Sequence, residues 1–158
     1  MTKELKQEYT LRITQANKTQ LVTILYEITL LYIDEAKEAL LSNKRDEFKN
    51  AVRRIQSCMC ELMDSLNLEY EIAHNLLQLY LFINREVASA ALHSDPEKLE
   101  HVRPIVEKLA MAYRQIESQD TTGPVMGNTQ TVYAGLTYGR GSITESIADP
   151  ATNRGFCV

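Results

Sequence analysis

The motif Glu71-Ile72-Ala73-His74 is the segment whose residue types and spacing come closest to a metal site. A helical bundle that binds two metal ions uses two Glu-x-x-His motifs together with a glutamate from each of two further helices. This sequence has one such motif, since Glu97 and His101 are four residues apart where the motif needs three. We therefore expect no metal ligands, and a ferritin-like metalloprotein stands as the alternative from another functional class.

Histidine and cysteine chemistry finds equally little support. A histidine phosphotransfer bundle needs small and basic residues beside the phosphorylated histidine, whereas His74 is followed by Asn, Leu, Leu and Gln. Cys58 and Cys60 are two residues apart and would point in different directions on a helix, and the third cysteine is Cys157. Glycine-rich nucleotide motifs and a Gly-x-Ser-x-Gly motif are also missing from the sequence. The sequence predicts a protein that is not an enzyme and needs no cofactor.

Composition narrows the class of protein further. The 158 residues, 44% of them apolar and 24% charged, are enough for one domain with a single core. The net charge of -4 gives no basic excess, so nucleic acid is not an expected partner. No apolar run approaches the roughly 18 residues that cross a membrane, and no signal peptide is evident. With an odd number of cysteines as well, we expect a cytoplasmic protein.

The positions of glycine indicate which part of the chain is helical, and these helices must carry the function. All six glycines lie at or after Gly123, and glycine and proline are the residues that cost a helix interior most. Periodicity predicts helices over 18–41, 45–66, 70–92 and 96–117, with Asn17 and Gln20 as a capping box. Short connections predict an all-α, antiparallel up-down four-helix bundle. Pro104 should kink or break the last helix near residues 101–103.

The remaining segments flank this bundle. Residues 1–16 are predicted to form an N-terminal arm, 17–119 the four-helix bundle, and 120–158 a mostly flexible tail rich in Gly, Thr and Ser. The tail contains two apolar pieces, 132–134 and 136–138, which either occupy a groove or stay solvated.

Two of the predicted helices carry more apolar surface than a single core contact needs. On 18–41, one stripe contains Leu21, Ile24, Leu25, Ile28, Tyr32, Ala36 and Ala39, and a second contains Val22, Tyr26, Leu30, Ile33 and Leu40. On 70–92, one stripe contains Ile72, Leu76, Leu79, Ile83 and Val87, and it is widened by Leu77, Tyr80 and Leu81. Either both helices touch neighbours on two sides, or they form a groove for a partner's amphipathic helix, which the N-terminal arm could cover.

Several segments resemble the flagellar export chaperone FliS family in their residues and in their order along the chain. The segment Leu21-Val22-Thr23-Ile24-Leu25-Tyr26-Glu27 resembles the start of its first long helix, and residues from Ala51 to Asn84 resemble its second and third helices. Asp95, Leu99, Val102, Leu109 and Ala112-Tyr113 are similar to its fourth helix, and Tyr9 with Ile13 resembles its arm. The resemblance covers roughly residues 5–118. Two departures are Tyr113, where the family usually has tryptophan, and Pro104.

This resemblance implies a chaperone that binds the disordered C-terminal region of flagellin in the cytosol. It would prevent premature polymerisation and deliver flagellin to the flagellar type III export apparatus through the export gate protein FlhA, acting as a monomer or weak homodimer. Another helical adaptor or secretion chaperone is the alternative. The expected flagellin contacts are Val22, Tyr26, Leu30, Ile33, Leu77, Tyr80 and Leu81. The expected groove cover or gate contact consists of Tyr9, Leu11 and Ile13.

Overall fold

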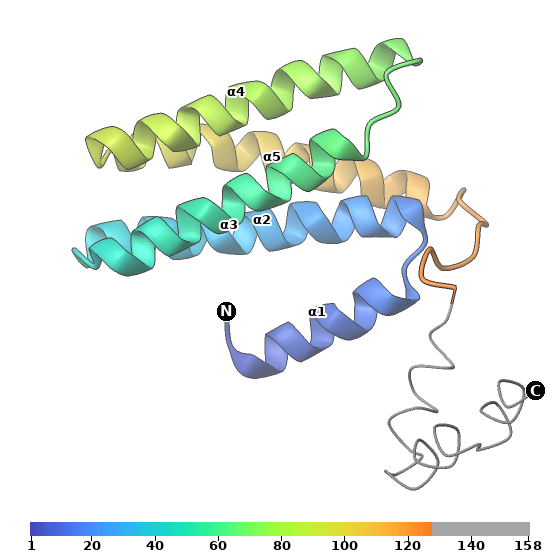
Figure 1. Ribbon diagram of the computed structural model, residues 1–158, viewed down its shortest axis with the longest axis horizontal. Helices are drawn as coiled ribbons and strands as arrows, with labels where there is room; N and C mark the ends of the chain where they lie inside the picture. Colours follow the sequence, from blue (N-terminus) through green and yellow to red (C-terminus); the bar gives the residue numbers. More distant parts are fainter. Residues whose placement is uncertain (128–158) are drawn as a thin grey trace, which may run out of the picture. The chain divides into compact units, whose positions relative to one another are not determined.

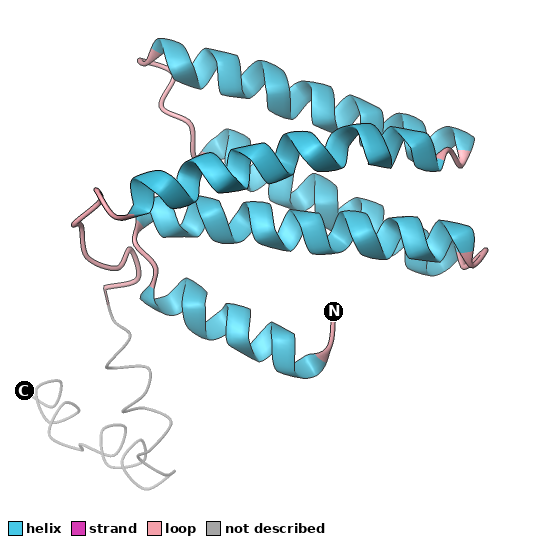
Figure 2. Ribbon diagram, turned by 180° about the vertical axis from the view of Figure 1, so that it is seen from behind, coloured by secondary structure: helices cyan, strands magenta, loops and turns pink. Residues whose placement is uncertain are grey.

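The computed structural model describes residues 1–127, and this part of the chain contains five helices and no strand (Figures 1 and 2). The helices are α1 (Lys3–Gln15), α2 (Lys18–Leu41), α3 (Arg45–Asp64), α4 (Glu71–His93) and α5 (Pro96–Glu117). The predicted all-α class is confirmed. Both apolar pieces predicted in the tail, 132–134 and 136–138, lie outside the described residues.

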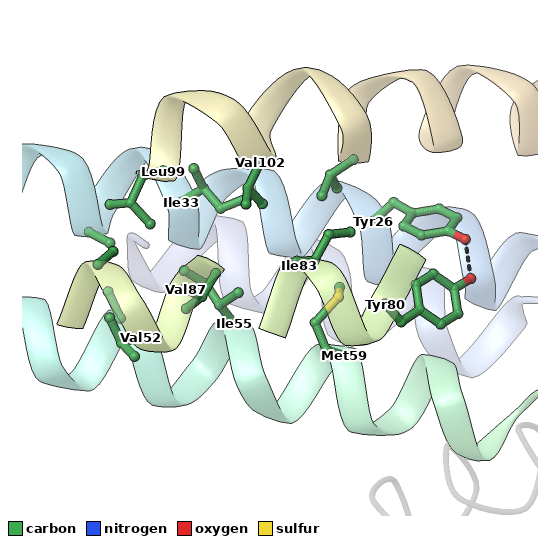
Figure 3. Close-up of a cluster of buried hydrophobic side chains, with 14 of the residues drawn as sticks. Tyr26, Ile33, Val52, Ile55, Met59, Tyr80, Ile83, Val87, Leu99 and Val102 are labelled. Atoms are coloured by element: carbon green, nitrogen blue, oxygen red, sulfur yellow. Dashed lines mark hydrogen bonds between the residues drawn. The ribbon is translucent and has the colours of Figure 1, made fainter. Parts of the chain in front are cut away.

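Helices α2 to α5 form a ring in which each helix packs on two others. Helix α2 packs on α3 and α5, and α4 packs on the same two helices from the opposite side, so α2 and α4 lie on a diagonal of the bundle. Figure 1 shows the chain reversing direction after each of these helices. Side chains from all four helices meet in the core shown in Figure 3, which includes Tyr26, Ile33, Ile55, Met59, Tyr80, Ile83, Val87, Leu99 and Val102.

Local signals explain where these helices begin and end. Asn17 accepts a hydrogen bond from the Gln20 amide at 2.8 Å, and the Gln20 side chain accepts one from the Asn17 amide at 3.0 Å, which forms the predicted capping box. Asp95 caps α5 by accepting a hydrogen bond from the Glu97 amide at 2.9 Å. Helix α4 ends at Ser94, whose φ of 53° places it in the left-handed region.

Pro104 was expected to kink or break α5, and it does not break the helix, since α5 continues through it to Glu117. Proline removes one amide donor, and this leaves the carbonyl of Glu100 without its helical partner. Both Pro104 and Glu100 are exposed, so water can bind that carbonyl. The loss of one backbone hydrogen bond on a solvent-facing side is compatible with a helix whose other side, with Leu99, Val102 and Val106, is fully buried.

The N-terminal segment, predicted as an arm, forms helix α1. Thr2 caps α1 by accepting a hydrogen bond from the Leu5 amide at 3.3 Å. Leu5, Tyr9 and Ile13 are spaced four residues apart, and each is partly buried along one side of α1. Helix α1 packs on α2. The four-residue spacing was the available signal for this amphipathic helix.

The segment that follows α5 is fastened to the start of α2. The Thr19 hydroxyl donates to the Asp120 carboxylate at 2.5 Å, and the Val125 amide donates to the Ala16 carbonyl at 3.0 Å. Hydrogen bonds from the hydroxyls of Thr122 and Thr19 lower the pKa of Asp120 to about 2. The two termini of the bundle sequence are therefore held together at one end of the molecule.

Candidate partner-binding surface

Most of the predicted α2 contacts are in the interior of the bundle. Tyr26 and Ile33 are 0% and 1% exposed, Val22 is 8% exposed, and Leu30 is partly buried against the same core. A partner could touch Tyr26 or Ile33 only if the helices separated. Because α2 packs on both α3 and α5, its second apolar stripe is occupied by neighbours within the bundle.

Tyr80 is buried with Tyr26, and the two hydroxyls share a hydrogen bond (Figure 3). The Tyr113 ring packs edge-on against Tyr26, with 5.4 Å between the ring centroids. Burial raises the pKa of Tyr26, and burial raises the pKa of Tyr80 to about 12. These phenols are neutral structural groups at the working pH of a cell.

Helix α4 carries the exposed apolar side chains of the predicted set. Leu81 is 47% exposed, and Leu77, one turn before it, is partly buried. Glu86 pairs with Lys98 of α5 at 3.3 Å, which identifies the edge of α4 that borders α5. Leu77 and Leu81 lie on the opposite edge of the helix, beside α3.

A second apolar edge of α4 was not predicted as a contact. Ile72 and Leu79 are 68% and 37% exposed, and they precede Glu86 by fourteen and seven residues, so they lie on the edge beside α5. Periodicity places both in one apolar stripe with Leu76, Ile83 and Val87, and this stripe was not among the predicted contacts. Their exposure arises because α4 packs on only two helices, α3 and α5. Sequence periodicity cannot show how many helices pack on a given helix.

An open apolar cavity of about 210 Å³ lies at the end of the bundle where α2 and α4 begin. It brings together two predicted contacts, Val22 and Tyr80, which are otherwise buried. The remaining apolar lining residues are Leu66, Tyr70, Ile72, Ala73, Leu76 and Tyr113. A partner's side chain could reach Val22 and Tyr80 from this cavity without separating the helices.

Helix α1 is held on α2 through the carboxylate of Glu27. Arg12 of α1 donates to Glu27 Oε2 at 2.6 Å, the Tyr9 hydroxyl donates to the same oxygen at 3.4 Å, and Arg114 of α5 donates to Oε1 at 2.8 Å. Burial opposes ionisation of Glu27, but the two guanidinium groups outweigh it and lower the pKa of this carboxyl. The N-terminal amino group of Met1 forms a further ion pair with Glu35, at the other end of α1.

The predicted cover residues take two different positions. Tyr9 and Ile13 are partly buried, whereas Leu11 is 43% exposed. Beneath α1, Ile24 is buried although it does not belong to the central core, and it lines a cavity with Arg12 and Ala16. Helix α1 therefore covers an apolar strip of α2 and leaves Leu11 available to solvent.

The groups considered for metal or thiol chemistry do not form a site within residues 1–127. Glu71 and His74 are exposed, and no cluster of three or more His, Cys, Asp or Glu that could hold a metal ion occurs within residues 1–127. Cys58 is buried, which raises the pKa of its thiol, while Cys60 is exposed. Among the helices described, none is long and apolar enough to cross a membrane.

The comparison with known families agrees with this arrangement. A protein-family model described as flagellar protein FliS matches residues 1–120, which spans all five helices. A search of curated protein sequences gives no match.

Proposed function

Because this chain belongs to the FliS family of flagellar proteins, we propose that it is a cytosolic export chaperone for flagellin. FliS is a family of flagellar export chaperones and not of enzymes. In this proposal the chain binds the disordered C-terminal region of flagellin and prevents its premature polymerisation. The complex is then delivered to the flagellar type III export apparatus, where the gate protein FlhA receives it.

The observation that supports this role most directly is the apolar surface around the start of α4. The cavity lined by Val22, Leu76 and Tyr113 offers a site for large apolar side chains of the client. The edge of α4 with Leu77 and Leu81 offers a second apolar surface, beside the cavity. An amphipathic client helix can place side chains one turn apart against such a strip. Tyr26, Ile33 and Tyr80 would then shape the surface from within the core.

Coupled folding and binding suits a chaperone that must release its client. A disordered segment loses conformational entropy when it orders, and this cost offsets part of the free energy gained from apolar burial. Typical ordering costs are about 2–5 kcal/mol or more, so a large interface need not bind irreversibly. An extended client can therefore cover both the cavity at the start of α4 and the edge with Leu77 and Leu81, and still be released to the export apparatus.

In the same proposal, α1 is a displaceable cover. Tyr9 and Ile13 lie over α2, and the contacts of Arg12 and Tyr9 with Glu27 are polar and partly exposed. Each such contact is worth little in water, so a client with more apolar surface can replace α1. Leu11 faces solvent when α1 is docked and is available for contact with the export gate.

A seeded polymerisation assay tests the chaperone role. Purified flagellin monomers are mixed with filament seeds, and growth is followed by light scattering with or without an equimolar amount of this protein. We expect growth to stop, because the region needed for filament assembly is bound. The matched control is the Leu81→Glu variant, which keeps the fold but places a charge on the proposed client strip. Unchanged growth with the wild-type protein would rule the proposal out.

A further inference from the structure

Three cationic side chains line a cavity of about 630 Å³ at the end of the bundle where α3 begins. They are Lys44, Arg45 and Lys49, and none of the lining residues is acidic. Lys44 pairs with Glu47 at 3.2 Å, while Arg45 and Lys49 form no ion pair within the described residues. The apolar part of the lining consists of Ala39, Leu40, Leu41, Phe48, Ala91 and Pro96. This is a basic, apolar recess on a protein whose net charge is -4.

The opposite end of α3 carries the complementary combination. Four exposed carboxylates surround the connection from α3 to α4, namely Glu61, Asp64, Glu69 and Glu71. Within residues 1–127 none of them forms an ion pair, although Glu69 accepts a hydrogen bond from Asn67 at 3.2 Å. Leu68 and Tyr70 project from the same connection and are 48% and 64% exposed. The connection is therefore an acidic tip with two exposed apolar side chains.

These two surfaces cannot meet within one molecule. Helix α3 has 20 residues, and at 1.5 Å per residue it separates the recess from the tip by about 30 Å. Figure 1 shows α3 running the length of the bundle between the two ends. We propose that the acidic tip of one copy docks into the basic recess of a second copy, with Tyr70 or Leu68 in contact with the Phe48 side of the recess.

The contact is heterologous, because two different surfaces of the same chain meet. Such a contact leaves a free recess and a free tip at the two ends of every pair, so it can extend into short head-to-tail chains. A tip of this size buries less area than a stable interface of about 1,200 Å² needs, and exposed ion pairs add little. The association is therefore weak, transient and sensitive to salt. Because Tyr70 also lines the cavity beside Val22, a client bound there would compete with the second copy.

Charge substitutions at either end provide the test, and both sets of substitutions are expected to preserve the fold. Arg45→Glu with Lys49→Glu places acidic groups in the first turns of α3, and Asp64→Lys with Glu69→Lys places a basic group at its C-terminal end. The changes within α3 agree with its helix dipole, and Glu69 is an exposed residue of the connection that follows. Circular dichroism and thermal unfolding of both variants verify the fold before association is measured.

The measurement is the average mass of the full-length chain by analytical ultracentrifugation over a wide concentration range at low salt. The wild-type mass should rise above the monomer value of 18.0 kDa as concentration increases, and high salt should reverse this. Each double variant alone should stay monomeric, and an equimolar mixture of the two should associate again, because the variant with the altered recess keeps an intact acidic tip and the variant with the altered tip keeps an intact basic recess. A wild-type protein that stays at 18.0 kDa, or a single variant that associates as the wild type does, would overturn the proposal. No flagellin is present, so the result does not depend on the proposed chaperone role.

Discussion

The hydroxyl of Tyr26 on α2 and the hydroxyl of Tyr80 on α4 share a hydrogen bond across the diagonal of the bundle (Figure 3). The two helices do not pack on each other as neighbours, so this bond joins elements that are otherwise connected through α3 and α5. Both side chains are fully buried, with 0% and 1% exposure. Each phenol is therefore the polar partner that allows the other to lie in an apolar core.

Replacing one of these phenols should cost more than replacing both. Tyr80→Phe leaves the Tyr26 hydroxyl buried without a partner, which should lower the free energy of unfolding by about 1–3 kcal/mol. Tyr26→Phe together with Tyr80→Phe removes both polar atoms and should recover most of that loss. Urea denaturation of the wild type, both single variants and the double variant gives the coupling energy. Strictly additive effects would show that the hydrogen bond does not link the two residues.

Neutralising Glu27 should loosen α1 without unfolding the bundle. Glu27→Gln weakens the contacts with Arg12 and Arg114, and for such partly exposed pairs we expect a loss of roughly 1 kcal/mol. The population with α1 undocked should then rise about fivefold. Hydrogen exchange of the α1 amides measures this change.

The control for that experiment is Glu38→Gln, the same substitution at an exposed position of α2. It should leave exchange in α1 at the wild-type rate. Equal exchange in Glu27→Gln and wild type would mean that α1 is held by its apolar side alone.

The docking of α1 should also weaken in acid. The pKa of Glu27 is lower with α1 docked than its ordinary value, because Arg12 and Arg114 stabilise the carboxylate against the effect of burial. The stabilisation of docked α1 by ionised Glu27 is therefore fully present above the ordinary glutamate pKa of about 4.3. It is lost as the pH falls through the lowered pKa of Glu27. Hydrogen exchange of α1 between neutral pH and pH near 3 should show wild-type protection falling towards that of Glu27→Gln. A constant difference between the two proteins over this range would contradict the assignment.

The sequence predicted the elements better than it predicted their surfaces. The glycine-free stretch, the capping box at Asn17 and the Asp95-Pro96 start are local signals, and the helices follow them closely. Local patterns cannot show which stripe of α2 faces the core, because that depends on which helices pack on it. The sequence analysis assigned Tyr26 and Ile33 to the flagellin contacts and Ile24 to the other stripe of this helix. Tyr26 and Ile33 lie inside the bundle, and Ile24 lies beneath α1.

The contacts of Glu27 also could not be predicted from local sequence patterns. Glu27 stands in the polar sector of α2 and carries no distinguishing local pattern. Its partners are 15 and 87 residues away in the chain, so only the packing of α1 and α5 on α2 brings the three side chains together.

A charge on the proposed client strip should weaken flagellin binding. Leu81→Glu changes an exposed residue of α4, so the fold should be kept while burial of a leucine by the client is lost. Losing such a burial is worth about 1.5–3 kcal/mol, or roughly tenfold or more in Kd. Met111→Glu, at a residue of α5 that is 55% exposed, is the matched control and should bind as the wild type does. Equal flagellin affinities of both variants and the wild type would show that the client does not bind at this edge of α4.

Calorimetric titration of the full-length protein measures whether this chain binds the C-terminal region of flagellin. The titrant is a synthetic peptide that covers the last forty or so residues of flagellin from the same organism. We predict a Kd in the micromolar range or tighter, with a markedly negative heat-capacity change from apolar burial and coupled folding. The Glu27→Gln variant should bind more tightly, because its α1 cover is easier to displace. Absence of binding to both proteins would contradict the account.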